Sequence, residues 1–346
     1  MKQRKSSFEL LRILSMLLII MHHFSIHTSW HIVPGLYYSK ALIEFFSIGG
    51  KIGVNCFILI SAYFMITKNA KSKALFKTWR TTLFYSIIIY CMLLPLYPQN
   101  LTLAPAIRSF FPVIKASYWF VSVYILLYIF SPYLNIMLNS LSKKDYQKLI
   151  LIQFTIFSVI ATFVRTPMIS NQFLWGLFVY IIGGYIRLHL DCKLTKKKLL
   201  VYLLISIVLT LLAIVILDFL SIYAPFLAGE ESTVFSDTQG FLPLISSVLI
   251  FLIFKQIDIG SISWINTIAP TMFSVYLIHD NFLIRPLLWH YVKSFTSSNP
   301  ISILIVGFAA PLIILVLCSL IDLIRIQIVS LSIKLFRAIK KDSVKS

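Results

Sequence analysis

Charged residues are scarce in this chain. Asp, Glu, Lys and Arg make up 12% of its 346 residues, about half the share that is usual in soluble domains. Hydrophobic residues make up 59%, and apolar runs of about 20 residues recur along the whole chain. Each such run is long enough to cross the ~30 Å hydrocarbon core of a bilayer. The composition excludes an ordinary soluble enzyme and predicts an all-α, polytopic integral membrane protein.

Acidic residues are scarcer still. The chain has 12 Asp and Glu residues against 31 Lys and Arg residues, so its formal net charge is +19. In a soluble protein, such a balance suggests a nucleic-acid partner. Here the basic residues lie mainly between the apolar runs, where they set the orientation of the chain in the membrane. We therefore expect contact with membrane lipid and no nucleic-acid partner.

Cysteine is also rare. The four cysteines are Cys56, Cys91, Cys192 and Cys318, and no two of them form a C-x-x-C motif. This spacing predicts neither a disulfide framework nor a zinc site. The cysteines are expected to serve as small packing residues in or beside the apolar runs.

The apolar runs predict a bundle of about ten transmembrane helices. The first run is expected to be retained, because no small-residue cleavage site follows MKQRKSSFELLRILSMLLIIMHHF. The expected spans are 8–27, 46–67, 75–97, 117–138, 148–166, 172–190, 199–219, 240–256, 267–289 and 300–323. Glycines interrupt the second span and charged residues the ninth, which indicates that these two face other protein or a water-filled cavity.

The distribution of Lys and Arg predicts that both termini are cytoplasmic. An even number of spans puts the two ends of the chain on one side. Basic residues are concentrated at the N-terminus, in alternate loops and in the tail, whereas the longest opposite loop carries Glu230, Glu231 and Asp237. We expect one transmembrane domain over residues 1–336 and a short basic cytoplasmic tail over 337–346.

The first span carries two polar side chains in an otherwise apolar run. Arg12 and His23 are 11 residues apart, which returns to within ~20° of the same helix face about 16 Å further along the axis. Charged groups at such depth usually face the interior of a bundle and mark function. The structural alternative is an arginine whose head reaches the interface and a core histidine that is bonded to a neighbour.

Two further histidines leave a metal site open as an alternative. His27 follows His23 by one turn and His31 by two, and imidazoles at i and i+4 can share a metal ion. However, the segment approaches a loop at Trp30, and no carboxylate or thiolate cluster stands nearby in the sequence. We therefore expect no metal.

Other spans and loops carry isolated candidates. Ser61 can act as a nucleophile only with a base nearby, and a helix-packing serine is the alternative. Lys77 and Arg80 stand one turn apart at a helix start. There they can bind a phosphorylated cosubstrate or anionic lipid, or can simply satisfy the topology.

The ninth span contains the most polar set within an apolar run. His279 and Asp280 can form a proton-handling pair or a purely structural one, with Arg285 as the counter-ion. At the start of the fourth span, Trp119 is expected to be an interfacial anchor.

Taken in order, these segments resemble the acyltransferase-3 family of membrane acyltransferases. ELLRILSMLLIIMHHF is similar to the family's first helix, where an Arg is followed by ten residues and a His, here Arg12 and His23. GVNCFILISAYFMI is similar to its "GV-F-F-SGF" segment, with Ala62 where Gly is usual. FKTWR resembles its cytoplasmic R-x-x-R, with Lys77 and Arg80 at the two ends.

The resemblance continues through the second half of the chain. SYWFVSVYILLYIFSP and VYIIGGYI are similar to the family's Trp-Phe span and to its Gly-containing sixth span. FSVYLIHDNF is similar to its "YL-H" span and contains Tyr276 and His279.

The resemblance implies a multi-pass O-acyltransferase of the bacterial cytoplasmic membrane. The donor would be acetyl-coenzyme A bound from the cytoplasm, and the acceptor would be a hydroxyl of a cell-surface glycan or lipid-linked sugar. His23 and Arg12 would be catalytic, and Lys77, Arg80 and Arg12 would bind the donor. Ser61, Trp119, Tyr276 and His279 are further candidates. We expect the membrane domain to complete transfer itself, or to pass the acyl group to a separate extracytoplasmic transferase or polysaccharide assembly proteins.

Two other functions are compatible with the same residues. A secondary transporter or flippase of lipid-linked glycan also has many spans, buried charges and glycine-broken helices, but performs no acyl transfer. In a non-catalytic assembly partner, the buried Arg12 and His23 would be structural, and replacing them would change stability but no chemistry.

Overall fold

The protein folds into helices. The computed structural model describes residues 5–68, 72–164, 171–224 and 239–342, and no strand occurs within these ranges. The helices are α1 Ser6–His27, α2 Tyr38–Ser47, α3 Gly49–Met65, α4 Ser72–Leu93, α5 Leu103–Phe110, α6 Trp119–Ser140, α7 Lys143–Phe154, α8 Ala161–Phe163, α9 Gln172–Leu188, α10 Lys196–Leu220, α11 Phe241–Gln256, α12 Ser263–Ile268, α13 Met272–His279, α14 Ile284–Ser294 and α15 Pro300–Asp342. A π-helical segment, Thr155–Ile160, joins α7 to α8. The predicted all-α class is confirmed.

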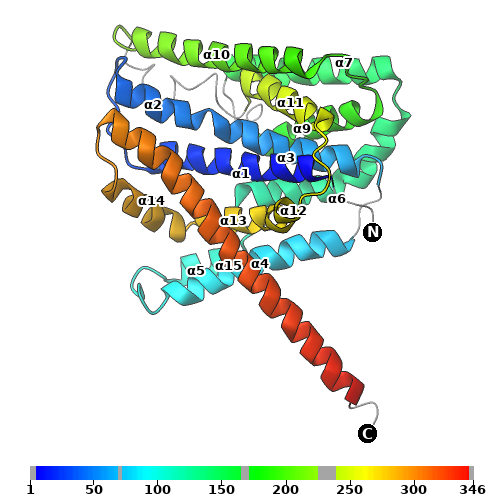
Figure 1. Ribbon diagram of the computed structural model, residues 1–346, viewed down its shortest axis with the longest axis vertical. Helices are drawn as coiled ribbons and strands as arrows, with labels where there is room; N and C mark the ends of the chain where they lie inside the picture. The colour runs from blue at the N-terminus through cyan, green and yellow to red at the C-terminus, as the bar shows by residue number, and fades with distance from the viewer. Residues whose placement is uncertain (1–4, 69–71, 165–170, 225–238, 343–346) are drawn as a thin grey trace.

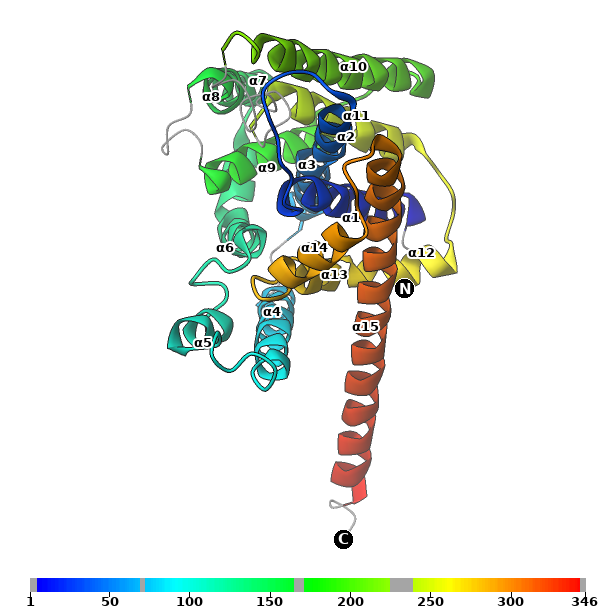
Figure 2. The same ribbon diagram turned by 90° about the vertical axis from the view of Figure 1, so that its left-hand side faces the viewer.

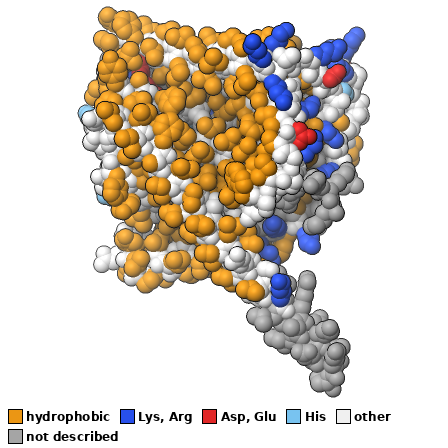
Figure 3. Space-filling model, viewed as in Figure 1, with side chains coloured by type: hydrophobic (Ala, Val, Ile, Leu, Met, Phe, Trp, Pro, Cys, Tyr) orange, Lys and Arg blue, Asp and Glu red, His pale blue; other side chains and the backbone are white. Residues whose placement is uncertain are grey.

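Six helical segments of the described chain are long and apolar enough to cross a membrane. They are Ser6–His27, Tyr38–Met65, Trp119–Ser140, Lys143–Phe163, Lys196–Leu220 and Pro300–Ser332, and α9 and α11 are shorter apolar helices. Figure 3 shows a broad hydrophobic face with Lys and Arg gathered along one edge, the side on which the N-terminal end lies in Figure 1. These features indicate a multi-pass membrane protein. The number of ten crossings stays a prediction.

α3 lies at the centre of the bundle, against α1, α9 and α11 (Figure 1). Glycines allow the close approach of α1. A side chain at Gly50 would collide with the ring of His22, and one at Gly53 would collide with the backbone carbonyl of Ser15. Small residues let membrane helices pack with their backbones close together. The glycines of the second predicted span therefore face α1, and they hold His22 and His23 beside the start of α3.

The ninth predicted span, 267–289, is not one continuous helix. A 3₁₀ turn, Ala269–Thr271, separates α12 from α13, and the chain leaves α13 at Asp280 before α14 begins (Figure 2). The side chain of Asn281 accepts a hydrogen bond from the N–H of Leu283 (2.9 Å). This local bond competes with the helical pattern. The break puts His279 and Asp280 at a helix end, where they can turn toward α1.

α15 is much longer than the predicted span over 300–323. It has 43 residues, which corresponds to about 65 Å. Figure 1 shows it crossing the bundle and continuing beyond it. Asp322 on this helix accepts hydrogen bonds from the hydroxyl of Tyr85 on α4 (2.6 Å) and from Arg325 (2.7 Å). α15 is continuous through residue 336, and the division into a domain and a tail stays a prediction.

Candidate functional site

Two histidines from distant parts of the chain meet inside the bundle. Nδ1 of His23, on α1, lies 2.9 Å from Nε2 of His279, at the end of α13. Nδ1 of His279 lies 2.7 Å from the carbonyl oxygen of Val275. Both side chains are buried.

This geometry fixes the protons on both rings. A carbonyl oxygen can only accept, so Nδ1 of His279 carries a proton and donates it to Val275. In a neutral imidazole the other nitrogen accepts, so Nε2 of His279 accepts from Nδ1–H of His23. Nε2 of His23 is then left with its lone pair. The pair therefore presents His23 as a base or nucleophile at Nε2.

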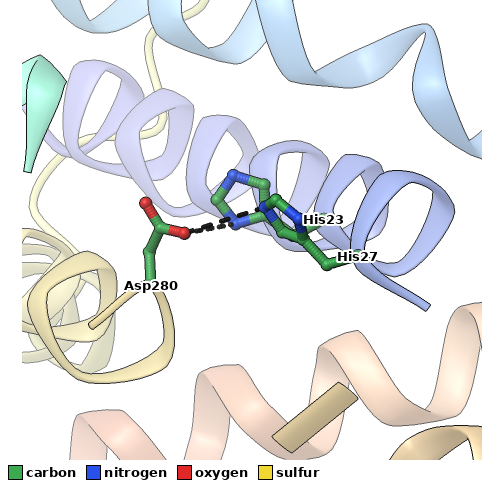
Figure 4. Close-up of side chains that lie close together, drawn as sticks. All are labelled: His23, His27 and Asp280. Carbon is green, nitrogen blue, oxygen red and sulfur yellow. Dashed lines mark ion pairs between the residues drawn. The ribbon is translucent and has the colours of Figure 1, made fainter. Parts of the chain in front are cut away.

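A carboxylate stands beside the pair. Oδ1 of Asp280 lies 3.8 Å from Nδ1 of His23 and 3.9 Å from Nε2 of His27 (Figure 4). Its ion-pair partner is Arg285, at 3.3 Å. Side-chain exposure rises from 9% for His23 to 25% for His27 and 35% for Arg285, so the cluster opens toward the surface past these two residues.

His23, His27 and Asp280 are also the one set of described residues whose ligand atoms could share a metal ion. Those three atoms lie within 4.8 Å of one another. However, Nδ1 of His23 is engaged by His279, and the guanidinium of Arg285 stands against Asp280. A second cation beside Arg285 would be repelled, so the set is better suited to proton transfer than to metal binding. The alternative site that included His31 is wrong, because α1 ends at His27 and His31 is exposed beyond it.

The end of α13 is held by a tyrosine from the start of α6. The hydroxyl of Tyr118 donates to the carbonyl oxygen of Leu277 (3.0 Å) and accepts from Nδ2 of Asn281 (2.6 Å). These bonds fix the backbone on both sides of His279. Sequence reasoning missed Tyr118 because its partners lie about 160 residues away, and no local pattern marks such a contact.

The structure places Arg12 apart from His23. The two residues share one face of α1, about 16 Å apart along the axis, as the spacing predicts. Arg12 is half-buried and pairs with Glu9 at 2.6 Å. The arginine close to the histidine cluster is Arg285. Glu9 is an ion-pair partner of Arg12 that the i, i+3 spacing could have revealed.

Lys77 and Arg80 are not brought to the histidines. Both are exposed on the first turns of α4, and neither forms an ion pair with a described residue. They stay available to an anionic ligand at the surface. α4 itself packs against α5, α13 and α6, and Tyr85 on α4 donates a hydrogen bond to Asp322 on α15.

The remaining candidates lie in three different places. Ser61 lines a small pocket between α3, α6 and α9, about 16 Å along α3 from Gly50, and no histidine is among its lining residues within the described chain. Trp119 is the first residue of α6 and has Nζ of Lys51 5.8 Å from its ring centroid. Tyr276 packs beside His279, with ring centroids 6.2 Å apart. Of the four further candidates, only His279 touches His23.

Comparison with known proteins gives one match. Residues 5–320 match the model of a family described as an acyltransferase domain, Acyl_transf_3. The chain matches no curated protein and no solved structure. The matched range begins just before α1 and ends within α15, so it contains the whole histidine cluster.

Proposed function

Since this chain belongs to the acyltransferase-3 family, we propose that it is a membrane O-acyltransferase that uses acetyl-coenzyme A. In this proposal it transfers an acetyl or similar acyl group to a hydroxyl of a cell-surface or lipid-linked glycan. The observation that carries the proposal is the hydrogen-bonded pair of His23 and His279, which leaves Nε2 of His23 as a base. A flippase or transporter does not require a base with an assigned tautomer.

His23 begins the proposed reaction by taking the proton of the acceptor hydroxyl at Nε2. The acceptor oxygen attacks the thioester carbonyl, so that a C–O bond forms and the C–S bond breaks. The leaving thiolate takes back the proton that His23 held. Asp280, 3.8 Å from Nδ1, stabilises the imidazolium that exists between these two steps.

The donor would bind at the basic edge of the molecule. Arg12, Lys77 and Arg80 lie on the cytoplasmic parts of α1 and α4 in this proposal, where cations suit the phosphates of coenzyme A. Arg12 stands between that edge and His23, about 16 Å from the base. This separation supports a role for Arg12 in donor binding rather than at the reacting carbonyl.

The proposed orientation has both termini in the cytoplasm of a bacterial cell and ten crossings of its membrane. The gathering of Lys and Arg along the edge near the N-terminus supports it (Figure 3). Glu230, Glu231 and Asp237, which entered the prediction, lie outside the described residues. A separate extracytoplasmic transferase or polysaccharide assembly proteins would be needed only if His23 does not complete the transfer.

Release of coenzyme A tests the proposal directly. The purified protein in detergent would be mixed with acetyl-coenzyme A, with and without host surface glycans. We expect glycan-stimulated release from the wild type and from His290→Ala, a control at an exposed histidine on α14. His23→Ala should lose the stimulated release while it keeps the same melting temperature. Equal release from His23→Ala and the wild type would contradict the proposal.

A further inference from the structure

Cations are unexpected at the end of the molecule opposite the basic edge. The predicted outer loops are poor in Lys and Arg, as the orientation rule requires. The described residues of these loops and of the adjoining helix ends nevertheless contain several cations: Lys40, Lys51, Arg108, Lys115, Arg285 and Lys293. Topology does not account for them, so each needs another reason.

Lys40 and Lys293 are accounted for by contacts within the fold. The ammonium of Lys40 is fully buried and lies 2.7 Å from Oδ1 of Asp218 on α10, which is also fully buried. Lys293 lies over the ring of Trp30, 4.1 Å from its centroid. These two cations are engaged within the fold and away from the histidines.

Three others are linked to segments that carry the histidine cluster, and Arg285 is the one in direct contact with it. Arg285 pairs with Asp280 at 3.3 Å. The guanidinium of Arg108, from α5, lies 4.3 Å from the ring centroid of Phe282, two residues after Asp280. Lys51 follows directly after Gly50, which packs against the ring of His22, the residue before His23. The cations thus come from α14, α5 and α3, and Arg108 and Arg285 flank the short segment from Asp280 to Phe282 that follows His279.

The two arginines can still accept a ligand. Arg108 is exposed and forms no ion pair with any residue that the structure describes. Arg285 keeps about a third of its side chain exposed while it contacts Asp280. A guanidinium presents a planar fork of donors that matches a carboxylate or a phosphate. One guanidinium group on Asp280 and a second on Phe282 favour a substrate that carries anionic groups.

We propose that the acyl acceptor is an anionic glycan, whose carboxylate or phosphate groups are held by Arg108 and Arg285 with Lys51 beside them. This inference rests on the proposed function and names the class of its acceptor. The anion would place a neighbouring hydroxyl at His23. An acidic sugar and a phosphate-bearing sugar offer the same recognition chemistry, so both belong to the proposal.

Binding to the purified full chain tests the inference without requiring catalysis. The probes are a neutral chitin oligosaccharide, an oligomer of galacturonic acid, and an oligosaccharide that carries glycerol phosphate. The readout is tryptophan fluorescence, because Trp119 lies beside Lys51. We expect at least one anionic probe to bind about tenfold more tightly than the neutral one, with an affinity that falls as salt rises.

Variants then locate the site. Arg108→Gln should lower the affinity for the anionic probe by about tenfold, which is the typical effect of losing one charged contact. Lys115→Gln, an exposed cation of the same loop with no contact to the cluster, should change nothing. Equal binding of all three probes, no binding of either anionic probe, or unchanged binding by Arg108→Gln would overturn the inference.

Coenzyme A release in the same samples separates this inference from the proposed function. If release requires His23 but neutral and anionic probes bind equally, the enzyme assignment stands and the anionic acceptor is wrong. If anionic probes bind through Arg108 but no release occurs with any of them, the cation site stands and the enzyme assignment fails.

Discussion

At the residue scale, the chemistry depends on which nitrogen of His23 carries the proton. His279 selects the tautomer by accepting from Nδ1–H, and it can do so because its own Nδ1–H is committed to Val275. An isolated core histidine would exchange between tautomers freely. The cluster therefore resembles other acyl-transfer sites in which a third group orients the base.

Replacement of His279 gives the sharpest test at this scale. We expect His279→Ala to lower kcat by about 10- to 100-fold, because His23 loses its orienting partner but keeps its own nitrogen. KM for acetyl-coenzyme A should not change, since His279 is far from the donor cations. Steady-state release of coenzyme A at varied donor concentration checks this. A raised KM with unchanged kcat would contradict an orienting role.

The sequence could predict His23 but not its environment. The spacing of Arg12 and His23 follows from helix geometry alone, and α1 forms over almost the predicted range. The contact between His23 and His279 spans 256 residues of sequence, and it depends on the break at Asp280. No periodicity predicts such a contact. Polar residues inside an apolar run indicated His279 and Asp280 as candidates. The same pattern could not show that His23 is their partner.

At the element scale, a buried ion pair joins two helices that are far apart in the sequence. Lys40 on α2 and Asp218 on α10 are both fully buried and lie 2.7 Å apart. Nearby, the hydroxyl of Ser221 accepts from the N–H of Gly35 (2.8 Å). Removing one member of a buried pair leaves an uncompensated charge, whereas replacing both members is often neutral.

This asymmetry predicts the outcome of a double-mutant cycle. Asp218→Leu alone should lower stability by about 3–5 kcal/mol, because the ammonium of Lys40 is left unpaired in a dry site. Lys40→Met combined with Asp218→Leu should recover most of the loss. Thermal unfolding in detergent, followed by circular dichroism, checks both. Equal losses in the single and the double variant would show that the pair is not coupled.

The ninth span, 267–289, was predicted from its apolar residues although His279, Asp280 and Arg285 interrupt it. In the structure the segment is divided into several helices, and Pro270 lies in the first break. Just after α13, the side chain of Asn281 bonds to the N–H of Leu283 and to the hydroxyl of Tyr118. The glycine-rich start of the second span was correctly expected to face protein, since small residues in a membrane helix admit a neighbouring backbone.

At the scale of the whole molecule, the basic residues and the histidine cluster lie toward opposite ends of α1. Lys and Arg collect along one edge (Figure 3), and the histidine cluster lies toward the opposite end of α1, in its last turns. A donor that enters at the basic edge must therefore extend its thioester along α1 to reach His23. An acceptor that arrives from the other side meets the more exposed His27 and Arg285 first. This separation is compatible with the function proposed above, in which a cytoplasmic donor is joined to an external glycan.

Chemical labelling can test that orientation in intact cells. In a variant without the four native cysteines, we expect Lys115→Cys to react with a membrane-impermeant maleimide added outside. Lys73→Cys should react only after the cells are permeabilised, because it lies in the first turn of α4, within the basic segment that is expected to face the cytoplasm. Both positions are exposed in the structure, so access to reagent is the only variable. The reverse pattern would mean that the protein has the opposite orientation. The histidine cluster would then lie in the cytoplasmic half of the membrane, which would rule out an external acceptor for His23. Labelling of both positions from outside would instead mean that residues 73 and 115 face the same side, which an odd number of crossings between them does not permit.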